Sequence, residues 1–274
     1  MEYTPNPNKP LACTVEGRTF YRHAIRTHYI RPKEDYIDII KTYVSDIYLP
    51  GDILSISEKI IALCQNRIIY KKDIRVSFFA KFLSKFVNVT PAGEAVGNPF
   101  KMQIAIDLCG LPKVLFAAVC AGFGKLFGKK GIFYKIVGME VIGLDGFCDD
   151  AFDDYLEMGI RIPENPNGVC DEIHEKLGIT CMIVDANDLH IDILGKSSDI
   201  NYDDAFLCGL IQQNPAGQAS QQTPLILIHE VTEQEESIPA FAPDAEKAPD
   251  ETETGNEPEA EAESAPAPEA NPEA

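Results

Sequence analysis

One stretch decides the fold class: Asn165-Pro-Asn-Gly-Val-Cys-Asp-Glu-Ile-His-Glu-Lys-Leu-Gly-Ile-Thr-Cys-Met-Ile-Val-Asp185. Asparagine as the N-cap and proline at the first helical position open a helix, which Gly178 closes. The apolar run Ile179–Val184 then reads as a strand, and Leu189–Leu194 reads as a second strand. A helix followed by strands predicts a sheet with helices packed on it.

The same alternation of periods extends outward through the chain. Apolar residues recur at helical spacing near 37–47 and 79–86, Asn98-Pro99 opens another helix, and 203–213 is helical in pattern. Strands are expected at Ile53–Ser57, Arg67–Tyr70, Ile132–Leu144 and Thr223–Val231. This mixture predicts an α+β or α/β body, and we adopt α+β: a mixed sheet with packed helices.

Charge divides the chain. The formal net charge is −19, but residues 232–274 alone carry 14 acidic residues against one basic residue, Lys247. That segment is rich in Glu, Ala and Pro and too poor in apolar residues to offset its ordering entropy. We expect a disordered lead-in over 1–13, one folded domain over 14–231 and a disordered acidic tail over 232–274. The tail serves either as a solvated solubility segment or as a docking arm.

Composition excludes several classes of protein. No long stretch is basic enough for a nucleic-acid binder that works by bulk charge. The eight cysteines form no Cys-x-x-Cys pair and lie mostly in apolar runs, which favours buried, reduced thiols and a cytoplasmic protein. The apolar stretch Val114–Phe123 is shorter than the roughly 20 residues of a membrane span, so we expect a buried helix or a loop packed on the core.

Two carboxylates are expected at the ends of strands. Asp145, followed by Gly146, ends the run from 137, and Asp185 ends the run from 181. Carboxylates held on a rigid sheet commonly position divalent cations and phosphates, although aspartate is also an ordinary turn residue. Asp188, His190 and Asp192 follow at a spacing of two, which places them on one face of a strand, either as ligands or facing solvent.

Five lysines form a basic island between Asp107 and Glu140, with no acidic residue among them. They are Lys113, Lys125, Lys129, Lys130 and Lys135. The glycines interspersed over 122–131 suit phosphate binding, but a solvated basic loop explains the same pattern. The segment is neither a P-loop nor Gly-x-Gly-x-x-Gly, and the chain has no Gly-x-Ser-x-Gly or His-Glu-x-x-His motif.

Taken in order, five motifs resemble the family of γ-glutamyl ligases that extend the glutamate tail of the deazaflavin coenzyme F-420. They are Gly51–Ile60, Ile142-Gly-Leu-Asp145, Arg161–Pro166, Ile183-Val-Asp185 and Ile191-Asp-Ile-Leu-Gly195. The resemblance covers about residues 25–230. It implies a mixed α and β fold, a homodimer, and an enzyme that uses GTP (or ATP) and Mg²⁺ or Mn²⁺ to join L-glutamate to a carboxylate acceptor.

Carried over by position, Asp145 and Asp185 match the metal-binding aspartates of the family, and we add Asp188 to this set. Lys59 is the expected catalytic residue. Lys125, Lys129 and Lys130 are the expected contacts to the nucleotide, through their positive charge. Small molecules are thus the expected partners, without nucleic acid or membrane.

The sequence also departs from the family at the pocket. The short segment 186–190 replaces the Gly-Arg-Pro-Trp-Arg segment of the family. Two other functions therefore stay open: a non-catalytic nucleotide- and metal-binding protein on the same scaffold, and a metal-dependent phosphohydrolase.

Overall fold

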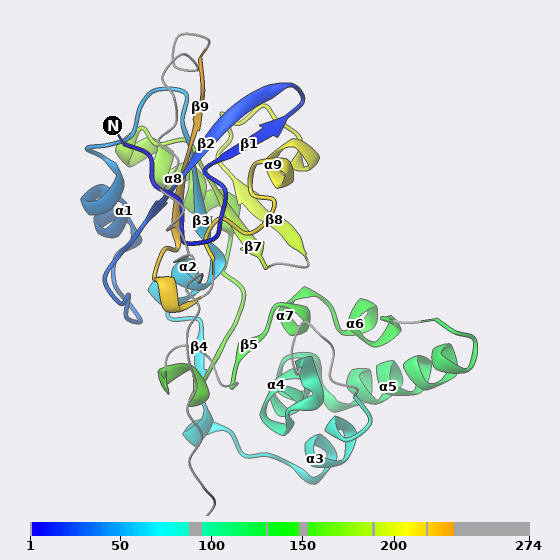
Figure 1. Ribbon diagram of the computed structural model, residues 1–274. Helices are drawn as coiled ribbons and strands as arrows, with labels where there is room; N and C mark the ends of the chain where they lie inside the picture. The colour runs from blue at the N-terminus through cyan, green and yellow to red at the C-terminus, as the bar shows by residue number, and fades with distance from the viewer. Residues whose placement is uncertain are drawn as a thin grey trace, which may run out of the picture. The chain divides into compact units, whose positions relative to one another are not determined.

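The computed structural model describes residues 2–87, 95–129, 131–147, 153–187, 190–217 and 219–232. These residues form a mixed six-stranded sheet, a three-stranded sheet and the helices packed against both (Figure 1). The predicted α+β class is confirmed. The predicted acidic tail lies, beyond Thr232, outside the described residues, and the domain boundary at 231 stays a prediction.

The six-stranded sheet is mixed. In spatial order its strands are β1 (Ala12–Val15), β2 (Arg18–Ile25), β9 (Leu225–Glu230), β3 (Ile53–Ser57), β7 (Cys181–Ala186) and β8 (Ile191–Lys196). Only β3 and β7 are parallel neighbours, and every other neighbouring pair in this sheet is antiparallel. Four of these strands match the sequence prediction. The hairpin β1–β2 was not predicted, and its turn places Glu16 (φ 50°) and Gly17 (φ 80°) in the left-handed region.

Helices cover both faces of this sheet, so its central strands are apolar on both sides. Helices α1 (Tyr36–Val44) and α8 (Pro166–Leu177) pack on one face, and α9 (Asp204–Leu210) packs on the other. On β3, Ile56 belongs to the first core and Ile53 to the second. A strand buried on both faces reads as a continuous apolar run, which is why the central strands were recognisable in the sequence.

The predicted helix boundaries are confirmed where capping residues mark them. The Asn165 side chain accepts a hydrogen bond from the Gly168 amide at the start of α8 (3.3 Å), and Gly178 ends that helix with φ 69°. The Asn98 side chain accepts one from the Phe100 amide at 2.8 Å. These contacts satisfy backbone groups that a helix end leaves unpaired.

The remaining elements form a second, smaller assembly. Its sheet has the order β4 (Ile68–Tyr70), β6 (Met158–Ile160) and β5 (Asp145–Gly146). Helix α2 (Glu58–Cys64) contacts both parts, because its Ile61 is buried in the core of the six-stranded sheet and its Ala62 and Leu63 pack with β6. The other helices of this assembly are α3 (Phe78–Ser84), α4 (Pro99–Cys109), α5 (Leu111–Leu126), α6 (Ile132–Val137) and α7 (Met139–Ile142). Short 3-10 turns lie at η1 (Lys71–Asp73), η2 (Ala95–Gly97), η3 (Asp153–Leu156) and η4 (Ala219–Gln221). Helices α3 to α7 share one apolar cluster, shown at the lower right of Figure 1.

The strand predicted over Ile132–Leu144 is wrong. The segment forms α6 and α7, which Gly138 separates with φ 98°. Val137 at the end of α6 and Val141 in α7 are buried, and both pack into the cluster of α3, α4 and α5. Tertiary packing therefore overrode the β preference of a run rich in Ile, Val, Phe and Tyr.

Helix α5 is buried on one side only, which corrects the expectation of a buried segment over Val114–Phe123. Val114, Ala117 and Gly124 are buried, whereas the large apolar side chains of Leu115, Phe116, Val119 and Phe123 are exposed. Among the described residues, no single helix is long and apolar enough to cross a membrane. Helices α4 and α5 reach that length and composition only as a pair bent by 117°.

The N-terminal residues contact the sheet, although the sequence predicted no fixed structure for 1–13. The Asn6 side chain is buried and donates to the Thr223 hydroxyl at 2.7 Å. The buried Arg22 guanidinium donates to the Pro10 carbonyl at 2.9 Å, and β1 begins at Ala12. Hydrogen bonds of this kind leave no pattern of apolar residues in the sequence, so hydrophobic periodicity could not predict them.

Candidate functional site

A pocket of ≈ 310 Å³ lies at one edge of the six-stranded sheet. Strands β3 and β7 are parallel, so both end at this edge, and the antiparallel β9 begins there. Ser57 ends β3 and Asp185 lies near the end of β7, while Thr27 after β2 and Thr223 before β9 complete the rim. Carboxyl ends of strands are where open α/β sheets commonly bind ligands.

An ion pair occupies one side of the pocket. The Lys59 ammonium, in the first turn of α2, lies 2.6 Å from Asp145 Oδ2. The other oxygen of Asp145, Oδ1, accepts a hydrogen bond from the Gly146 amide at 2.7 Å. Lys59 Nζ also lies 5.6 Å from the centre of the Tyr155 ring. The expected catalytic lysine and one expected metal ligand are therefore in direct contact.

Two further carboxylates line the pocket without an ion pair to any described residue. Glu58, which directly follows β3, is only 8 % exposed, and its buried Oε2 has no hydrogen-bond partner in the part of the chain that the structure describes. Burial and the charges of Asp185 and Asp145 raise the pKa of Glu58 to about 9. Burial, Asp145 and Asp192 also raise the pKa of Asp185. The pocket thus concentrates negative charge at the ends of β3 and β7.

Asp145 behaves differently from its neighbours. Burial by itself would raise the pKa of Asp145, but Lys59 and, more weakly, Lys101 hold it below its ordinary value. Lys101 is a buried residue of α4 and is only 6 % exposed. Asp145 therefore stays ionised, and its carboxylate in β5 attracts the ammonium of Lys101 in α4.

The backbone at Asp145 departs from the sequence prediction. Asp145 does not end a long strand, because it follows α7 and begins the two-residue strand β5. Gly146 adopts φ 87°, and a Cβ atom there would lie 2.1 Å from the Met158 carbonyl oxygen. The glycine is thus required by the close approach of β6, a neighbouring strand, rather than by a ligand.

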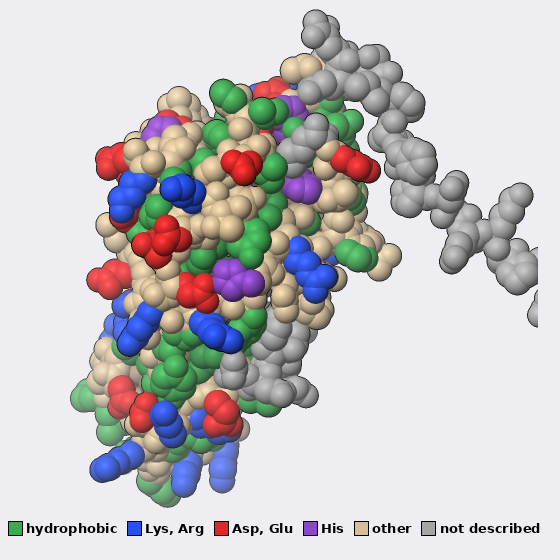
Figure 2. All heavy atoms as spheres, turned by 90° about the vertical axis from the view of Figure 1, so that its left-hand side faces the viewer, with side chains coloured by type: hydrophobic (Ala, Val, Ile, Leu, Met, Phe, Trp, Pro, Cys, Tyr) green, Lys and Arg blue, Asp and Glu red, His purple; other side chains and the backbone are tan. Residues whose placement is uncertain are grey.

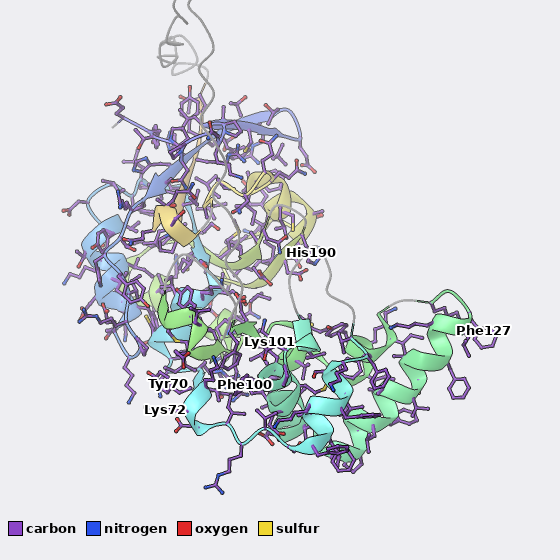
Figure 3. The ribbon with its side chains drawn as sticks, turned by 60° about the horizontal axis from the view of Figure 1, so that its bottom comes forward. Tyr70, Lys72, Phe100, Lys101, Phe127 and His190 are labelled. Carbon is purple, nitrogen blue, oxygen red and sulfur yellow. The ribbon has the colours of Figure 1, made fainter. Side chains whose placement is uncertain are left out.

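The structure brings together only some of the predicted site residues. Lys59, Asp145 and Asp185 line one pocket, whereas Asp188 and Lys130 lie outside the described residues. Lys125 and Lys129 do not line it. They flank Phe127 at the C-terminal end of α5, which Figure 3 shows well apart from Lys101 and His190. Lys125 and Lys129 therefore do not share a site with the carboxylates among the described residues.

His190 and Asp192 do share a face of the β8 segment, as their spacing predicted. His190 Nε2 lies 2.9 Å from Asp192 Oδ2, and both side chains are well exposed. Asp192 is also the register partner of Asp185 across β7 and β8. No group of three His, Cys, Asp or Glu side chains within the described ranges has the geometry of a metal centre.

Sequence reasoning missed Glu58 and Lys101 as site residues. Glu58 directly follows a predicted strand, so the rule that selected Asp185 would have found it. Lys101 has no such signal, because it lies in a helix far along the chain from β3 and β7, and only folding brings it near Asp145.

Together, the fold and the pocket define a class: an α+β protein with a charged pocket of small-molecule size at the carboxyl edge of a mixed sheet. The model of the F420-0:gamma-glutamyl ligase family matches residues 24–187, which is more than half of the chain. The chain belongs to this family. Family membership supports ligase activity that adds glutamate, with small molecules as substrates. No curated protein matches the chain.

Proposed function

We propose that this protein joins the amino group of an amino acid, L-glutamate in the first place, to a carboxylate of a small-molecule acceptor such as the deazaflavin coenzyme precursor. A nucleoside triphosphate, GTP or ATP, would drive the reaction. The observation that carries the proposal is the grouping of Lys59, Asp145, Glu58 and Asp185 in one pocket, all within the residues that match the ligase family.

The proposed reaction has two displacements. An acceptor carboxylate oxygen attacks the γ-phosphorus, the nucleoside diphosphate leaves, and an acyl phosphate forms. The amine nitrogen then attacks the acyl carbon, phosphate leaves, and the amine proton passes to a carboxylate of the pocket. Lys59 would place its positive charge against the phosphoryl oxygens, and Asp145 would hold the ammonium in position before substrate binds.

The carboxylates of the pocket fit a divalent cation. Glu58 carries a buried oxygen with no hydrogen-bond partner among the described residues, and burial together with neighbouring carboxylates raises the pKa of both Glu58 and Asp185. Mg²⁺ is usually held by one or two carboxylates plus substrate phosphates, so three protein ligands are not required. Asp185 and Glu58 would hold Mg²⁺ or Mn²⁺, with Asp145 beside them. The ion would neutralise phosphate charge.

A second function has its own support in the pocket. Both oxygens of Asp145 are engaged, by Lys59 and by the Gly146 amide, and the segment after Asp185 is short. A scaffold that binds nucleotide and metal without forming product is compatible with both features.

Thermal unfolding tests whether the protein binds a nucleotide together with a divalent cation. We expect GTP or ATP, added with Mg²⁺ or Mn²⁺, to stabilise the protein by about 2.7 kcal/mol at a ligand concentration 100 times its Kd. The Asp185→Asn variant should lose this gain, whereas Asp46→Asn, an exposed aspartate outside the pocket, should keep it. No stabilisation of the unmodified protein by any of these pairs would refute nucleotide binding.

Product formation separates the ligase from the binding protein. Glutamate and the deazaflavin precursor are offered with nucleotide and metal, and the conjugate is measured by mass spectrometry. Lys59→Met should reduce the rate at least 100-fold, as expected when a charged contact to the transition state is lost. Lys72→Met removes a lysine outside the pocket and should leave the rate unchanged. Nucleotide-dependent stabilisation without any conjugate would favour the binding protein.

A further inference from the structure

Helix α3 carries an outward stripe of phenylalanines. Phe78 is 75 % exposed, Phe82 follows one turn later, and Phe86 follows just beyond the helix. Their rings contact one another, with centroids of Phe82 and Phe86 5.0 Å apart. The opposite side of the helix, including Ala80 and Leu83, is buried in the helical cluster. The phenylalanines therefore contribute nothing to the core and face solvent.

Helix α5 carries a second outward stripe. Leu115, Phe116, Val119, Phe123 and Leu126 recur at helical spacing and are all exposed. The stripe continues into Phe127, which is 79 % exposed and projects from the end of the helix in Figure 3.

The two stripes lie close to each other. Lys125 Nζ donates to the Phe86 carbonyl at 3.4 Å, which joins the end of α5 to the end of α3. The buried sides of both helices meet in the same cluster. We call this surface the α3–α5 face, formed by Phe78, Phe79, Phe82, Phe86, Leu115, Phe116, Val119, Phe123, Leu126 and Phe127. An exposed apolar surface of this kind marks an interaction site.

Charge sets this part of the chain apart from the rest. Residues 74–139 contain nine Lys and Arg residues but only two acidic residues, Glu94 and Asp107, in a protein of net charge −19. Six of the lysines are exposed on or beside these helices, namely Lys81, Lys85, Lys113, Lys125, Lys129 and Lys135. Figure 2, which looks from the left-hand side of Figure 1 and so not at this face, also shows Lys and Arg side chains beside hydrophobic surface toward the lower end of the molecule. An apolar face bordered by lysines complements an anionic, apolar partner.

We propose that the α3–α5 face docks on the surface of an anionic phospholipid bilayer, with its phenylalanines in the headgroup boundary and its lysines against the lipid charges. Phe and Leu on one side of a helix with Lys beside them are the composition of elements that lie in the membrane interface. A span does not fit, because the 16 residues of α5 reach only about 24 Å against a hydrocarbon core of about 30 Å. A second copy of the chain fits less well, because like faces would bring lysines against lysines.

Flotation with vesicles tests the proposal. The full-length protein should float with vesicles of equal parts phosphatidylcholine and phosphatidylglycerol, and not with phosphatidylcholine alone. Phe116→Ser combined with Phe123→Ser should abolish binding, whereas Leu49→Ser, an exposed leucine outside the face, should leave it unchanged. Equal binding by the Phe116→Ser, Phe123→Ser variant, or no binding of the unmodified protein, overturns the proposal.

Two matched double variants test how much the lysines contribute to vesicle binding. Lys125→Gln with Lys129→Gln should weaken partitioning into the anionic vesicles about fivefold per lysine. Lys33→Gln with Lys41→Gln removes the same charge elsewhere and should have little effect. Salt should weaken binding of the unmodified protein, because ions screen the lysines from the headgroups. Equal losses in both pairs would refute a role for the face.

A conservative substitution protects the test against misfolding. The chain has no tryptophan, so Phe123→Trp introduces a single tryptophan into the face and Leu49→Trp introduces one elsewhere, and each can be excited apart from the tyrosines. With anionic vesicles the emission of the first variant should shift to shorter wavelength, and that of the second should not. No shift overturns membrane docking. A concentration-dependent dimer that the Phe116→Ser, Phe123→Ser variant dissociates, with no vesicle binding, would assign the face to a second copy.

Discussion

The buried carboxyl of Glu58 predicts an unusual dependence of stability on pH. Burial and two neighbouring aspartates raise its pKa from 4.5 to about 9. At pH 7 the folded protein therefore keeps a proton that the unfolded chain releases. Keeping this proton lowers the free energy of unfolding. The loss is absent below pH 4.5, grows by about 1.4 kcal/mol per pH unit as the pH rises, and levels off above the pKa of Glu58 in the folded protein. It reaches about 3 kcal/mol at pH 7.

Glu58→Gln removes this penalty, because glutamine has nearly the shape of a protonated glutamate and no proton to lose. In metal-free buffer with EDTA, we expect the variant to match the unmodified protein near pH 4 and to exceed its free energy of unfolding by about 3 kcal/mol at pH 7. Urea unfolding followed by circular dichroism, repeated across this range, measures the difference. Glu175→Gln, an exposed glutamate of α8, serves as the control. A difference that does not change with pH would refute the reasoning.

Two further predictions concern stability. Gly146→Ala should lower the free energy of unfolding by at least about 2 kcal/mol in urea, because its φ of 87° and the carbonyl 2.1 Å from the new Cβ both oppose a side chain. Gly128→Ala, with φ 69° but open space around it, should cost only about 1 kcal/mol. The hydrogen bond from Arg18 lowers the pKa of Glu230, so this pair stabilises the protein at neutral pH. Because both side chains are more than a third exposed, Arg18→Gln should cost less than about 1 kcal/mol at pH 7. That cost should vanish as the pH falls through the folded pKa of Glu230, and an undiminished cost at low pH would count against the pair.

The proposed site differs from the one that the sequence suggested. Glycines and lysines over 122–131 suited either phosphate binding or a solvated basic loop, and in the structure Lys125 and Lys129 lie beside the exposed phenylalanines of α5. Lys101, which no motif marks, adds its positive charge to that of Lys59 near Asp145. Local composition identifies where positive charge lies along the chain, but not which carboxylate it will meet, because that depends on how α4 packs against β5.

The sequence was most informative about helix boundaries that capping residues mark. Asn165 caps the start of α8, Pro166 suits its first position and Gly178 ends it, in ways that depend only on local sequence, so both boundaries could be predicted. It was least informative at 132–144, where β-branched residues form two short helices around Gly138. There the competing strand and helix patterns differ little, and contacts with α3, α4 and α5 decide between them.

The sequence by itself determined the α+β class, the family and the position of Asp185 near the end of a buried strand, because periodicity, caps and motif order are local properties of the chain. Only the tertiary structure decided that Asp145 pairs with Lys59, that Glu58 shares their pocket, and that the phenylalanines of α5 face outward. Burial and electrostatic pairing depend on distances between residues far apart in the chain, and only the packed fold sets those distances.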